Sequence, residues 1–467
     1  MSLPFTLAKI ILSLLGNRRR QEFIRACQNP ARTQEDLKNK ILKNSLKAFP
    51  DRPTTYLDYE GSPSLTKEAV AFKETTSGST GSKKQIPYTK SLLKSFEHMF
   101  LLWAHDLIFH SDLGIKKGKF FMSVSPQIGE KPEDDRKYLS PILSFLLTPF
   151  LVSNPDKHKA RTSEEFLMNI SRELLHARDL EIISIWSPTY LLSLMDFIDK
   201  NKQQLGLKNE VIHWDRVWPE LKLISCWTEA QAEKSASRLK EKLPGVFIQG
   251  KGLLSTEAPV TIPWSLARGN VPLLTETYLE FLDKDQHILK LHELNIGETY
   301  VVLTSQFNGY LRYNTQDEVQ VTGFYHHTPI LSFLGRTGQY SDLAGEKLSE
   351  SILKRLYSNT NASFLIVPDE SHDLPRYVIY VDTSIPEPDM DWEKPLMENH
   401  HYKLARSLGQ LSPVKVLTLP DLNQKIMEFY QQQGMVLGDI KEKLLITKPL
   451  EARNFIEWIE LELGSSL

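Results

Sequence analysis

Residues 75–85 read Thr-Thr-Ser-Gly-Ser-Thr-Gly-Ser-Lys-Lys-Gln, and no other stretch of the chain says as much about its fold and chemistry. Two glycines, six hydroxyl side chains and two lysines stand within these eleven residues. Glycine lets backbone amides come close to an anion, hydroxyls and successive N–H groups form an anion-binding concavity, and lysine adds a positive charge. The stretch predicts a loop that holds a polyphosphate, although a flexible surface loop would have similar composition.

The spacing of the glycines argues against one familiar phosphate loop. A P-loop requires Gly-x4-Gly-Lys-Ser/Thr, in which the hydroxyl binds Mg²⁺. Here two residues separate Gly78 from Gly81, and Ser-Lys-Lys follows the second glycine. A P-loop kinase or GTPase is therefore not expected.

Composition is that of a globular protein with more than one domain. The chain has 467 residues, of which 41% are apolar and 24% are charged, and its net charge is −2. This charge gives no argument for a nucleic-acid surface. The two cysteines form no disulfide framework and no metal-ligand spacing, so a cytoplasmic protein is expected.

The N-terminus carries an apolar run from Leu3 to Leu15, followed by arginines at 18–20. The run is too short to span a bilayer, and no cleavage site follows it, so we expect neither an integral membrane span nor a secretory signal. An amphipathic helix that docks on the domain is one interpretation of this segment, and peripheral contact with a membrane is the other.

Apolar strands alternate with helical patterns through the first half of the chain, which predicts a mainly parallel α/β sheet. The expected strands cover residues 119–125, 180–186, 221–227 and 246–249, and the expected helices include 91–109 and 229–243. Such sheets bind ligands in the loops at the carboxyl ends of their strands. Further strands at 275–282, 299–304 and 318–322 are expected to be antiparallel.

A domain boundary is expected at the Gly-Arg-Thr-Gly turn that begins at Gly335. Residues 1–335 then form a large N-terminal domain. Residues 336–467 have a smaller α/β pattern, with helices at 349–357, 400–408 and 421–432 and strands at 363–367, 376–381 and 414–418. We interpret this second part as a small C-terminal lid domain.

Two further motifs contain candidate carboxylates, and the first is expected, from its position after a strand, to face the same crevice as the glycine-rich stretch. Gly252–Glu257 follows an expected strand, so Glu257 could hold Mg²⁺ beside phosphates, although a helix N-cap followed by an acid has the same pattern. In residues 309–317, Asp317 ends a loop at the start of a strand and could accept both hydroxyls of a ribose, although a β-turn acid explains it as well.

Together these motifs resemble those of the acyl-adenylate-forming enzymes, in which the phosphate loop reads Thr-Ser-Gly-Ser/Thr-Thr-Gly-x-Pro-Lys-Gly. Residues 76–81 and Lys84 match that loop. Thr256 and Glu257 match its Tyr-Gly-x-Thr-Glu motif, in which Leu253 and Leu254 replace Tyr and Gly. The ending Lys-x-Ile-Pro-Tyr is similar to that of the auxin-responsive-promoter family of acyl acid amido synthetases.

The third motif of that family, Leu-Tyr-Arg-Tyr-Arg-x-Gly-Asp, is matched at Arg312, Tyr313 and Asp317, whereas Asn314 and Gln316 replace its second Arg and its Gly. Residues 335–336 resemble its Gly-Arg hinge, and residues 345–350 match its Gly-Glu-Lys-Leu-x-Glu. Residues 438–441 resemble its Gly-x-x-Lys near the C-terminus.

The resemblance implies an α/β fold, with a large adenylate-forming N-terminal domain of mixed sheets and a small mobile C-terminal α/β lid. It also implies roles for individual residues. The polyphosphate of ATP would be held by Ser77, Gly78, Ser79, Thr80, Gly81 and Lys84. Glu257 would hold Mg²⁺, Thr256 would reach the reacting acyl phosphate, and Asp317 and Arg336 would fix the ribose. Lys441 would offset charge on the α-phosphate, although a solvated lysine explains it as well.

The function that the resemblance implies is ATP- and Mg²⁺-dependent activation of a small-molecule carboxylic acid, followed by amide formation with an amine, in the first instance an amino acid. An acyl-CoA or acyl-protein ligase and a nucleotide-binding protein without turnover are the alternatives. A monomer is expected. Trp103, His105 and Tyr190 are candidates for the acyl pocket, although helix packing explains them equally well.

Overall fold

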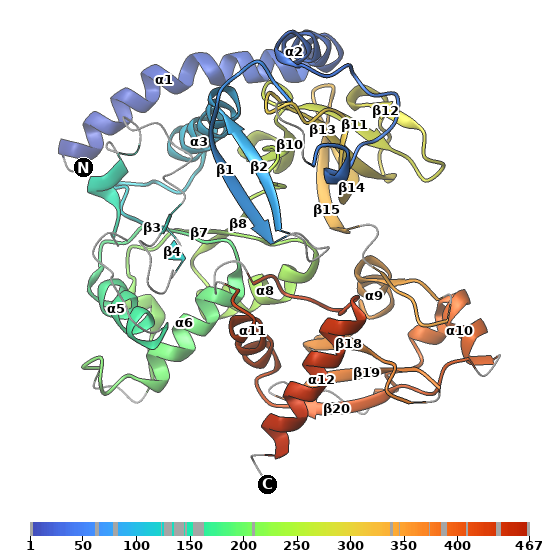
Figure 1. Cartoon of the computed structure of the whole chain (residues 1–467). Coiled ribbons are helices and arrows are strands. Elements are labelled where there is room, and N and C mark those ends of the chain that lie inside the picture. Colours follow the sequence, from blue (N-terminus) through green and yellow to red (C-terminus); the bar gives the residue numbers. More distant parts are fainter. Residues whose placement is uncertain are drawn as a thin grey trace. The chain divides into compact units, whose positions relative to one another are not determined.

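A computed structural model of the chain (Figure 1) describes residues 3–60, 65–77, 83–122, 124–125, 133–134, 144, 147–152, 163–207, 211–336, 340–344, 346–372, 374–383, 390–407, 410–435 and 440–464. Contacts divide the chain into two compact units. The first contains residues 1–186, 201–227 and 242–334, and the second contains residues 187–200, 228–241 and 335–467. The last change of unit falls between Leu334 and Gly335. The division into domains 1–335 and 336–467 stays a prediction, because the two inner segments group with the later residues.

A four-stranded parallel sheet lies in the first unit, in the order β3-β6-β7-β8. The strands are β3 (Phe120–Met122), β6 (Ile182–Ser184), β7 (Leu223–Cys226) and β8 (Phe247–Gly250). Phe121, Ile183 and Ile224 stand side by side across the first three strands, and all are fully buried. The apolar runs that predicted these strands are therefore core-forming, as is usual for parallel sheets. Helices α5 (Ser163–His176) and α7 (Trp214–Val217) belong to the same unit.

The second sheet of this unit is antiparallel and has the order β12-β11-β13-β14-β15. Its strands are β11 (Tyr278–Leu282), β12 (Ile288–Lys290), β13 (Thr299–Ser305), β14 (Tyr313–Tyr325) and β15 (Thr328–Arg336). Buried and half-buried residues alternate along the first part of β14, as expected for one face on a core. The short strands β9 (Thr261–Trp264) and β10 (Gly269–Pro272) pair beside it. The antiparallel strands are present as expected, and β14 begins earlier than residue 318.

An antiparallel hairpin, β1 (Val70–Ser77) and β2 (Lys83–Thr89), leads directly into helix α3 (Lys90–His110). Thr89 caps this helix, since its side chain accepts a hydrogen bond from the N–H of Leu92. Two short strands, β4 (Val124–Ser125) and β5 (Glu133–Asp134), also pair. The hairpin is the element that presents the glycine-rich stretch.

Helices α1 (Leu3–Gln28) and α2 (Pro30–Asn44) precede the hairpin. Asn29 caps α2 with its side chain, and Pro30 occupies the first helical position, where a missing N–H costs nothing. Helix α1 packs against α3 (Figure 1), and its Phe23 ring lies 4.9 Å from the ring of Trp264. Among the described residues, no helix is both long enough and apolar enough to cross a bilayer.

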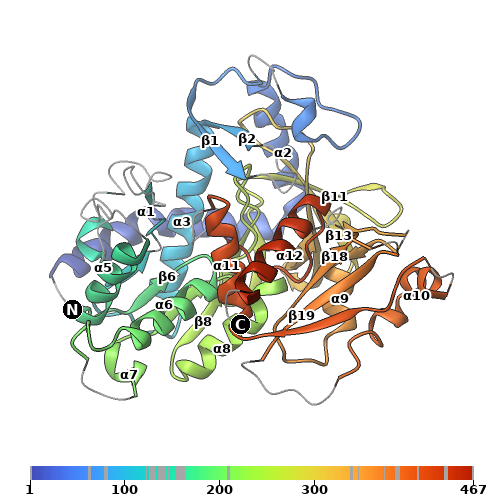
Figure 2. The ribbon, with the colours of Figure 1, turned by 60° about the horizontal axis from the view of Figure 1, so that its bottom comes forward.

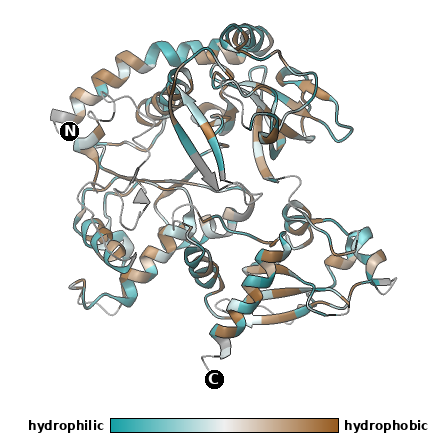
Figure 3. Cartoon of the chain, in the orientation of Figure 1, coloured by the Kyte–Doolittle hydropathy of each residue, from teal (hydrophilic) through white to brown (hydrophobic). Residues whose placement is uncertain are grey.

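The second unit is built on a three-stranded mixed sheet of β18 (Phe364–Asp369), β19 (Arg376–Asp382) and β20 (Lys415–Leu419). Both faces of this sheet are buried, because Phe364 and Ile366 pack in one apolar cluster and Leu365 and Val367 in another. Figure 3 shows these central strands as mostly hydrophobic. Helices α11 (Leu422–Gln432) and α12 (Pro449–Gly464) supply the second cluster and lie together on one face (Figure 2).

The other elements of the second unit are several short segments and the two helices from residues 187–200 and 228–241, which lie between segments of the first unit in the sequence. They are α6 (Pro188–Lys200), α8 (Glu233–Lys242), β16 (Tyr340–Ser341), β17 (Leu348–Ser349), α9 (Glu350–Leu356) and α10 (His400–Ser407). The final residue of α8 falls in the first unit. The helices and strands expected after residue 340 are present within a few residues of their predicted bounds.

Candidate functional site

The glycine-rich stretch connects the two strands of the hairpin. Thr76 stands opposite Lys84, and Ser77 stands opposite Lys83. Gly78, Ser79, Thr80 and Gly81 lie outside the described residues, and so does the side chain of Ser77. Their role stays a prediction.

Lys84 is described, and its ammonium group is held by tyrosines. Its Nζ donates a hydrogen bond to Tyr313 Oη at 3.2 Å. The same nitrogen lies 5.9 Å from the ring centres of both Tyr313 and Tyr56, within the range of cation–π attraction. The side chain is half-buried, so the protein holds the ammonium group in one place instead of leaving it mobile in solvent. Lys84 therefore lies against β14, which carries the third motif.

A stack of tyrosine rings continues from this lysine. The rings of Tyr313 and Tyr310 are 5.2 Å apart, and those of Tyr310 and Tyr59 are 4.7 Å apart. Tyr59 fixes the stack because its Oη donates to Leu311 O at 2.7 Å. Burial raises the pKa of Tyr310, and the neighbouring Tyr56 and the charge of Glu257 raise it further. The stack thus connects Lys84 with the surroundings of Glu257.

Residues 252–257, which contain the Thr-Glu motif, form a bend and not the start of a helix. The interpretation of Thr256 and Glu257 as a helix N-cap and its following acid is therefore wrong. Gly252 has a φ of +75°, and a Cβ atom there would lie 2.7 Å from Thr261 Oγ1. Only glycine accommodates both conditions. Leu253, which replaces the aromatic residue of the family motif, is buried in the apolar core.

Two hydrogen bonds from other elements hold this bend. Tyr88 Oη, from β2, donates to Thr256 O at 2.8 Å. Asn308 Nδ2, from the loop before β14, lies 3.5 Å from Glu257 O. Tyr88 and Lys84 belong to the same strand, so β2 links Lys84 through Tyr88 to the bend that carries Thr256 and Glu257.

Asp317 lies on β14 at the point where the register of the pairing between β13 and β14 shifts. Its side chain is buried. Gln316, which replaces the glycine of the family motif, has a φ of +62° and so adopts the left-handed conformation that glycine favours. Its N–H donates to Asn314 Oδ1 at 2.8 Å, and this turn supports the strained backbone. The backbone before Asp317 therefore keeps the left-handed conformation although residue 316 is not glycine.

Arg312, by contrast, has a structural role. Its Nε and Nη2 atoms donate to the two carboxylate oxygens of Glu280 at 2.9 and 2.7 Å. Both side chains are largely buried, and the guanidinium also lies 4.6 Å from the ring of Phe49. This bidentate pair fixes the loop that carries Tyr310 and Tyr313.

Sequence reasoning missed a group of polar and aromatic side chains at the carboxyl ends of the parallel strands. Lys251 follows β8, and its Nζ donates to Ser184 Oγ, at the end of β6, at 2.8 Å. The same nitrogen lies 4.9 Å from the ring of Trp186, which is 5.9 Å from that of Trp227 after β7. The signal was available, because Trp186 and Trp227 end two predicted strands and Lys251 follows a third.

Trp103 belongs to this region, because its Nε1 donates to Gln249 Oε1, in β8, at 2.8 Å. The other two pocket candidates are buried within helix packing. His105 is buried against α1, where its Nε2 lies 2.9 Å from Asn17 Oδ1, and burial lowers its pKa to about 4. Tyr190 is buried in α6, which groups with the second unit. Helix packing therefore accounts for His105 and Tyr190.

Arg336 and Lys441 both belong to the second unit, and their roles stay predictions. Arg336 is the last residue of β15. Lys441 is exposed and follows the buried Ile440. The segment after it is anchored, because Leu444 N donates to Glu350 Oε1 at 3.1 Å and Ile366 N donates to Leu444 O at 2.8 Å.

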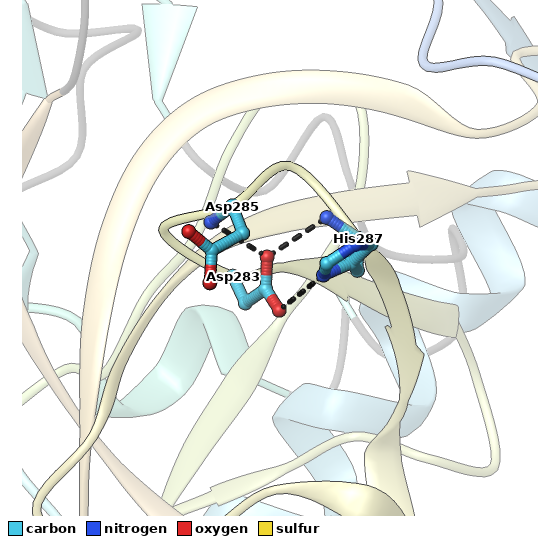
Figure 4. A group of neighbouring side chains, drawn as sticks. All are labelled: Asp283, Asp285 and His287. Carbon is cyan, nitrogen blue, oxygen red and sulfur yellow. Dashed lines mark hydrogen bonds and ion pairs between the residues drawn. The ribbon is translucent and has the colours of Figure 1, made fainter.

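One group of side chains has the composition of a metal site in a place that no motif predicted. Asp283, Asp285 and His287 lie close together in the turn between β11 and β12 (Figure 4). Asp283 Oδ1 accepts the N–H groups of Asp285 and His287 at 2.9 and 2.8 Å. These bonds explain the group as a turn closed by its own aspartate.

Three domains of one family match the chain in order. The GH3 family N-terminal domain matches residues 56–209, its central domain residues 270–336, and its C-terminal domain residues 349–449. This chain belongs to the GH3 family. The resemblance found in the sequence motifs is thereby confirmed, and the three matches contain the hairpin, β14 and Lys441.

Curated GH3 relatives share stretches of sequence with this chain. A probable indole-3-acetic acid-amido synthetase, GH3.11, of Oryza sativa subsp. japonica is 23% identical over 264 residues, which are 47% of this chain and 43% of that protein. The 4-substituted benzoates-glutamate ligase GH3.12 of Arabidopsis thaliana is 29% identical over 112 residues, which are 23% of this chain and 19% of that protein. The matched segments thus span less than half the length of these relatives.

Solved structures confirm the fold. The GH3.15 acyl acid amido synthetase in complex with 2,4-DB matches with a TM-score of 0.75 at 17% identity, covering 94% of this chain and 95% of that chain. A 2-hydroxyisobutyryl-CoA ligase in the postadenylation state matches with a TM-score of 0.51 at 12% identity, covering 95% and 90%. The α/β architecture expected from the sequence is shared with these two enzymes.

Proposed function

We propose that this GH3 protein activates a carboxylic acid with ATP and transfers the acyl group to an amine, most simply that of an amino acid. In the first step a carboxylate oxygen bonds to the α-phosphorus, and the bond to the β-phosphate oxygen breaks, which releases pyrophosphate. In the second step the amine nitrogen bonds to the acyl carbon, loses a proton and displaces AMP. The relatives named as amido synthetases support this order of reactions.

The observation that carries the proposal is the placement of Lys84. Its ammonium group is half-buried beside the glycine-rich stretch and is held by Tyr313. A positioned cation at the end of such a loop favours a bound polyphosphate, because the charge needs little reorganisation when the anion arrives. Tyr310 stacks on Tyr313, and Tyr59 stacks on Tyr310, so both rings support this arrangement.

Glu257 is the residue proposed to hold Mg²⁺. Its donor chemistry fits, since Mg²⁺ prefers carboxylate oxygens together with those of substrate phosphates. Its negative charge acts on the Tyr310 ring, which stacks on Tyr313 beside Lys84. When bound, Mg²⁺ would neutralise charge on the phosphates. Thr256 is adjacent, with its carbonyl tied to Tyr88 and its hydroxyl proposed for the reacting phosphate.

Asp317 and Arg336 are proposed to bind the ribose, and Lys441 to offset charge on the α-phosphate. The group at the ends of β6, β7 and β8 is proposed to receive the acyl acid, since ligands of parallel sheets bind at these ends. Its two tryptophans and Lys251 favour an aromatic acid that carries a second hydrogen-bond acceptor. Rotation of the C-terminal residues as a lid would exchange the two half-reactions.

The test is acid-dependent exchange of label between pyrophosphate and ATP, measured over aryl, indole and aliphatic carboxylic acids. The acids that support exchange are then offered amino acids or coenzyme A, and the products are identified by mass spectrometry. Amide products support the proposal, whereas thioester products would assign the chain to the acyl-CoA ligases. Binding of ATP without exchange for any acid would assign it to nucleotide-binding proteins without turnover.

A further inference from the structure

Helix α1 presents an apolar stripe to solvent that the proposed reaction does not use. Leu7, Ile10 and Leu14 are 59%, 53% and 75% exposed. Residues spaced by three, four and seven positions share one face of a helix. Leu15, 50% exposed, widens the stripe. Single exposed leucines are ordinary, but a contiguous row at helical spacing indicates a contact surface.

This surface is not the result of a loosely attached helix, because the opposite face of α1 is tightly packed. Phe5 is buried over Gly118, where a Cβ atom would lie 2.4 Å from the Phe5 ring. Gly16 approaches His105 so closely that a Cβ atom would lie 2.5 Å from that ring. Phe23 packs in the core. The stripe is therefore held outward in a fixed orientation.

Basic residues continue the same exposed face toward the C-terminal end of α1. Arg18 and Arg25, at positions eleven and eighteen after Leu7, lie on the same side by helical periodicity, and both are exposed. The helix as a whole contains five basic residues and one acidic residue, Glu22. Arg18 forms an exposed ion pair with Glu22, and five basic residues against one acidic residue leave the helix with a net charge of +4.

We infer that this face of α1 docks the protein on an anionic lipid surface. The apolar half would enter the boundary between headgroups and acyl chains, and the arginines would meet the headgroups. Contact between two copies of the chain would bring like charges together at Arg18 and Arg25, whereas anionic headgroups complement them. The helix precedes residue 56, where the match to the GH3 N-terminal domain begins, and it contains none of the residues proposed for catalysis.

The experiment is sedimentation of the full chain with vesicles of phosphatidylcholine alone or mixed with phosphatidylglycerol. The wild type should bind the mixed vesicles, and rising salt should weaken binding. A double variant, Leu7→Ser with Leu14→Ser, should bind at least about tenfold more weakly, because two side chains that would enter the lipid are lost. Arg18→Gln with Arg25→Gln should lose the preference for the anionic vesicles.

The matched control is Ile296→Ser, which removes an isolated apolar side chain that is 64% exposed in a turn of the same unit, and it should bind as the wild type does. Thermal unfolding should show that all variants are folded, since the altered residues are exposed. Failure of the wild type to bind, or equal binding by the leucine variant, would overturn the inference. A self-association that the leucine variant abolishes, seen by sedimentation velocity, would overturn it in favour of a second copy of the chain.

Discussion

At the level of single residues, Lys84 is expected to contribute more to polyphosphate binding than any other residue that the structure describes. Lys84→Ala should slow pyrophosphate exchange by about one to two decades, because a charge-assisted hydrogen bond contributes roughly 1.5–3 kcal/mol. Tyr313→Phe should have a smaller effect, since it removes only the hydroxyl that holds the ammonium group. Lys73→Ala, an exposed lysine of the same hairpin, is the control. Normal exchange by folded Lys84→Ala protein would remove the assignment of this loop to phosphates.

Glu257 can be tested through the dependence of exchange on Mg²⁺. Glu257→Gln preserves the size of the side chain and removes its charge, so the fold should be kept while the Mg²⁺ concentration needed for exchange rises. Glu318→Gln is the matched control, because Glu318 is also a half-buried acid of the first unit, in which burial raises the carboxyl pKa. If Glu257 has no metal role, the Mg²⁺ titrations of the two variants should coincide.

At the level of elements, β14 shows how a strand keeps a glycine-like conformation without glycine. Gln316→Gly should change the free energy of unfolding by less than about 1 kcal/mol, because relief of the positive φ and the greater freedom of the unfolded chain offset each other. Gln316→Val should destabilise by about 1–3 kcal/mol, since a β-branched residue is poorly accommodated there.

Denaturant unfolding gives these free energies. Gln320, in the same strand, provides the comparison, because Gln320→Val should be tolerated in an ordinary strand conformation. An equal cost of valine at both positions would mean that the irregularity of β14 places no demand on residue 316.

Helix α9 contains the group expected to make stability depend on pH. Burial raises the pKa of Glu350 to about 7, and the N–H of Leu444 and the charge of Lys443 offset this only in part. Between the ordinary carboxyl pKa of about 4.5 and about 7, the folded protein therefore holds a proton that the unfolded chain has released. Stability must fall as pH rises through this window and level off above it.

The expected size of this effect, reduced for partial exposure of the side chain, is on the order of 1–2 kcal/mol. The measurement is the difference in stability between wild type and Glu350→Gln, obtained from thermal unfolding over this pH range. The contributions of other titrating groups cancel in this difference. The wild type should lose stability relative to the variant as pH rises. Parallel pH profiles of the two proteins would refute the raised pKa.

At the scale of the whole molecule, Lys441 tests whether the C-terminal residues act as a lid. A lysine delivered by the lid should matter for adenylate formation, where it offsets charge on the phosphate, and less for amide formation. Lys441→Ala should slow pyrophosphate exchange and leave a preformed acyl-adenylate able to react with amine. Lys415→Ala, exposed on β20, is the control. Equal slowing of both steps would indicate a misfolded lid, and no slowing would return Lys441 to the solvated surface.

Much of the architecture was open to prediction because its causes are local. The apolar runs of β3, β6, β7 and β8, the helix after the hairpin and the strands of the second unit follow from periodicity and turn residues, which short-range sterics and burial dictate. The start of α3 is an example, since the helix begins at Lys90, one residue before the predicted start, and Thr89 caps it. The order of the motifs was likewise sufficient to indicate the family.

The sequence by itself determined these elements, the family and the residue types that we propose for phosphate binding, but only the tertiary structure decided which side chains meet. Lys84 and Tyr313 are 229 residues apart in the chain and are joined because β2 packs near β14. The cluster of Lys251 with Trp186 exists because β8 and β6 end at one edge of a sheet. His105 was a candidate for the acyl pocket until its packing against α1 placed it elsewhere. Local propensities depend on neighbours in the chain, whereas such contacts depend on how distant elements share one core, which no short stretch of sequence specifies.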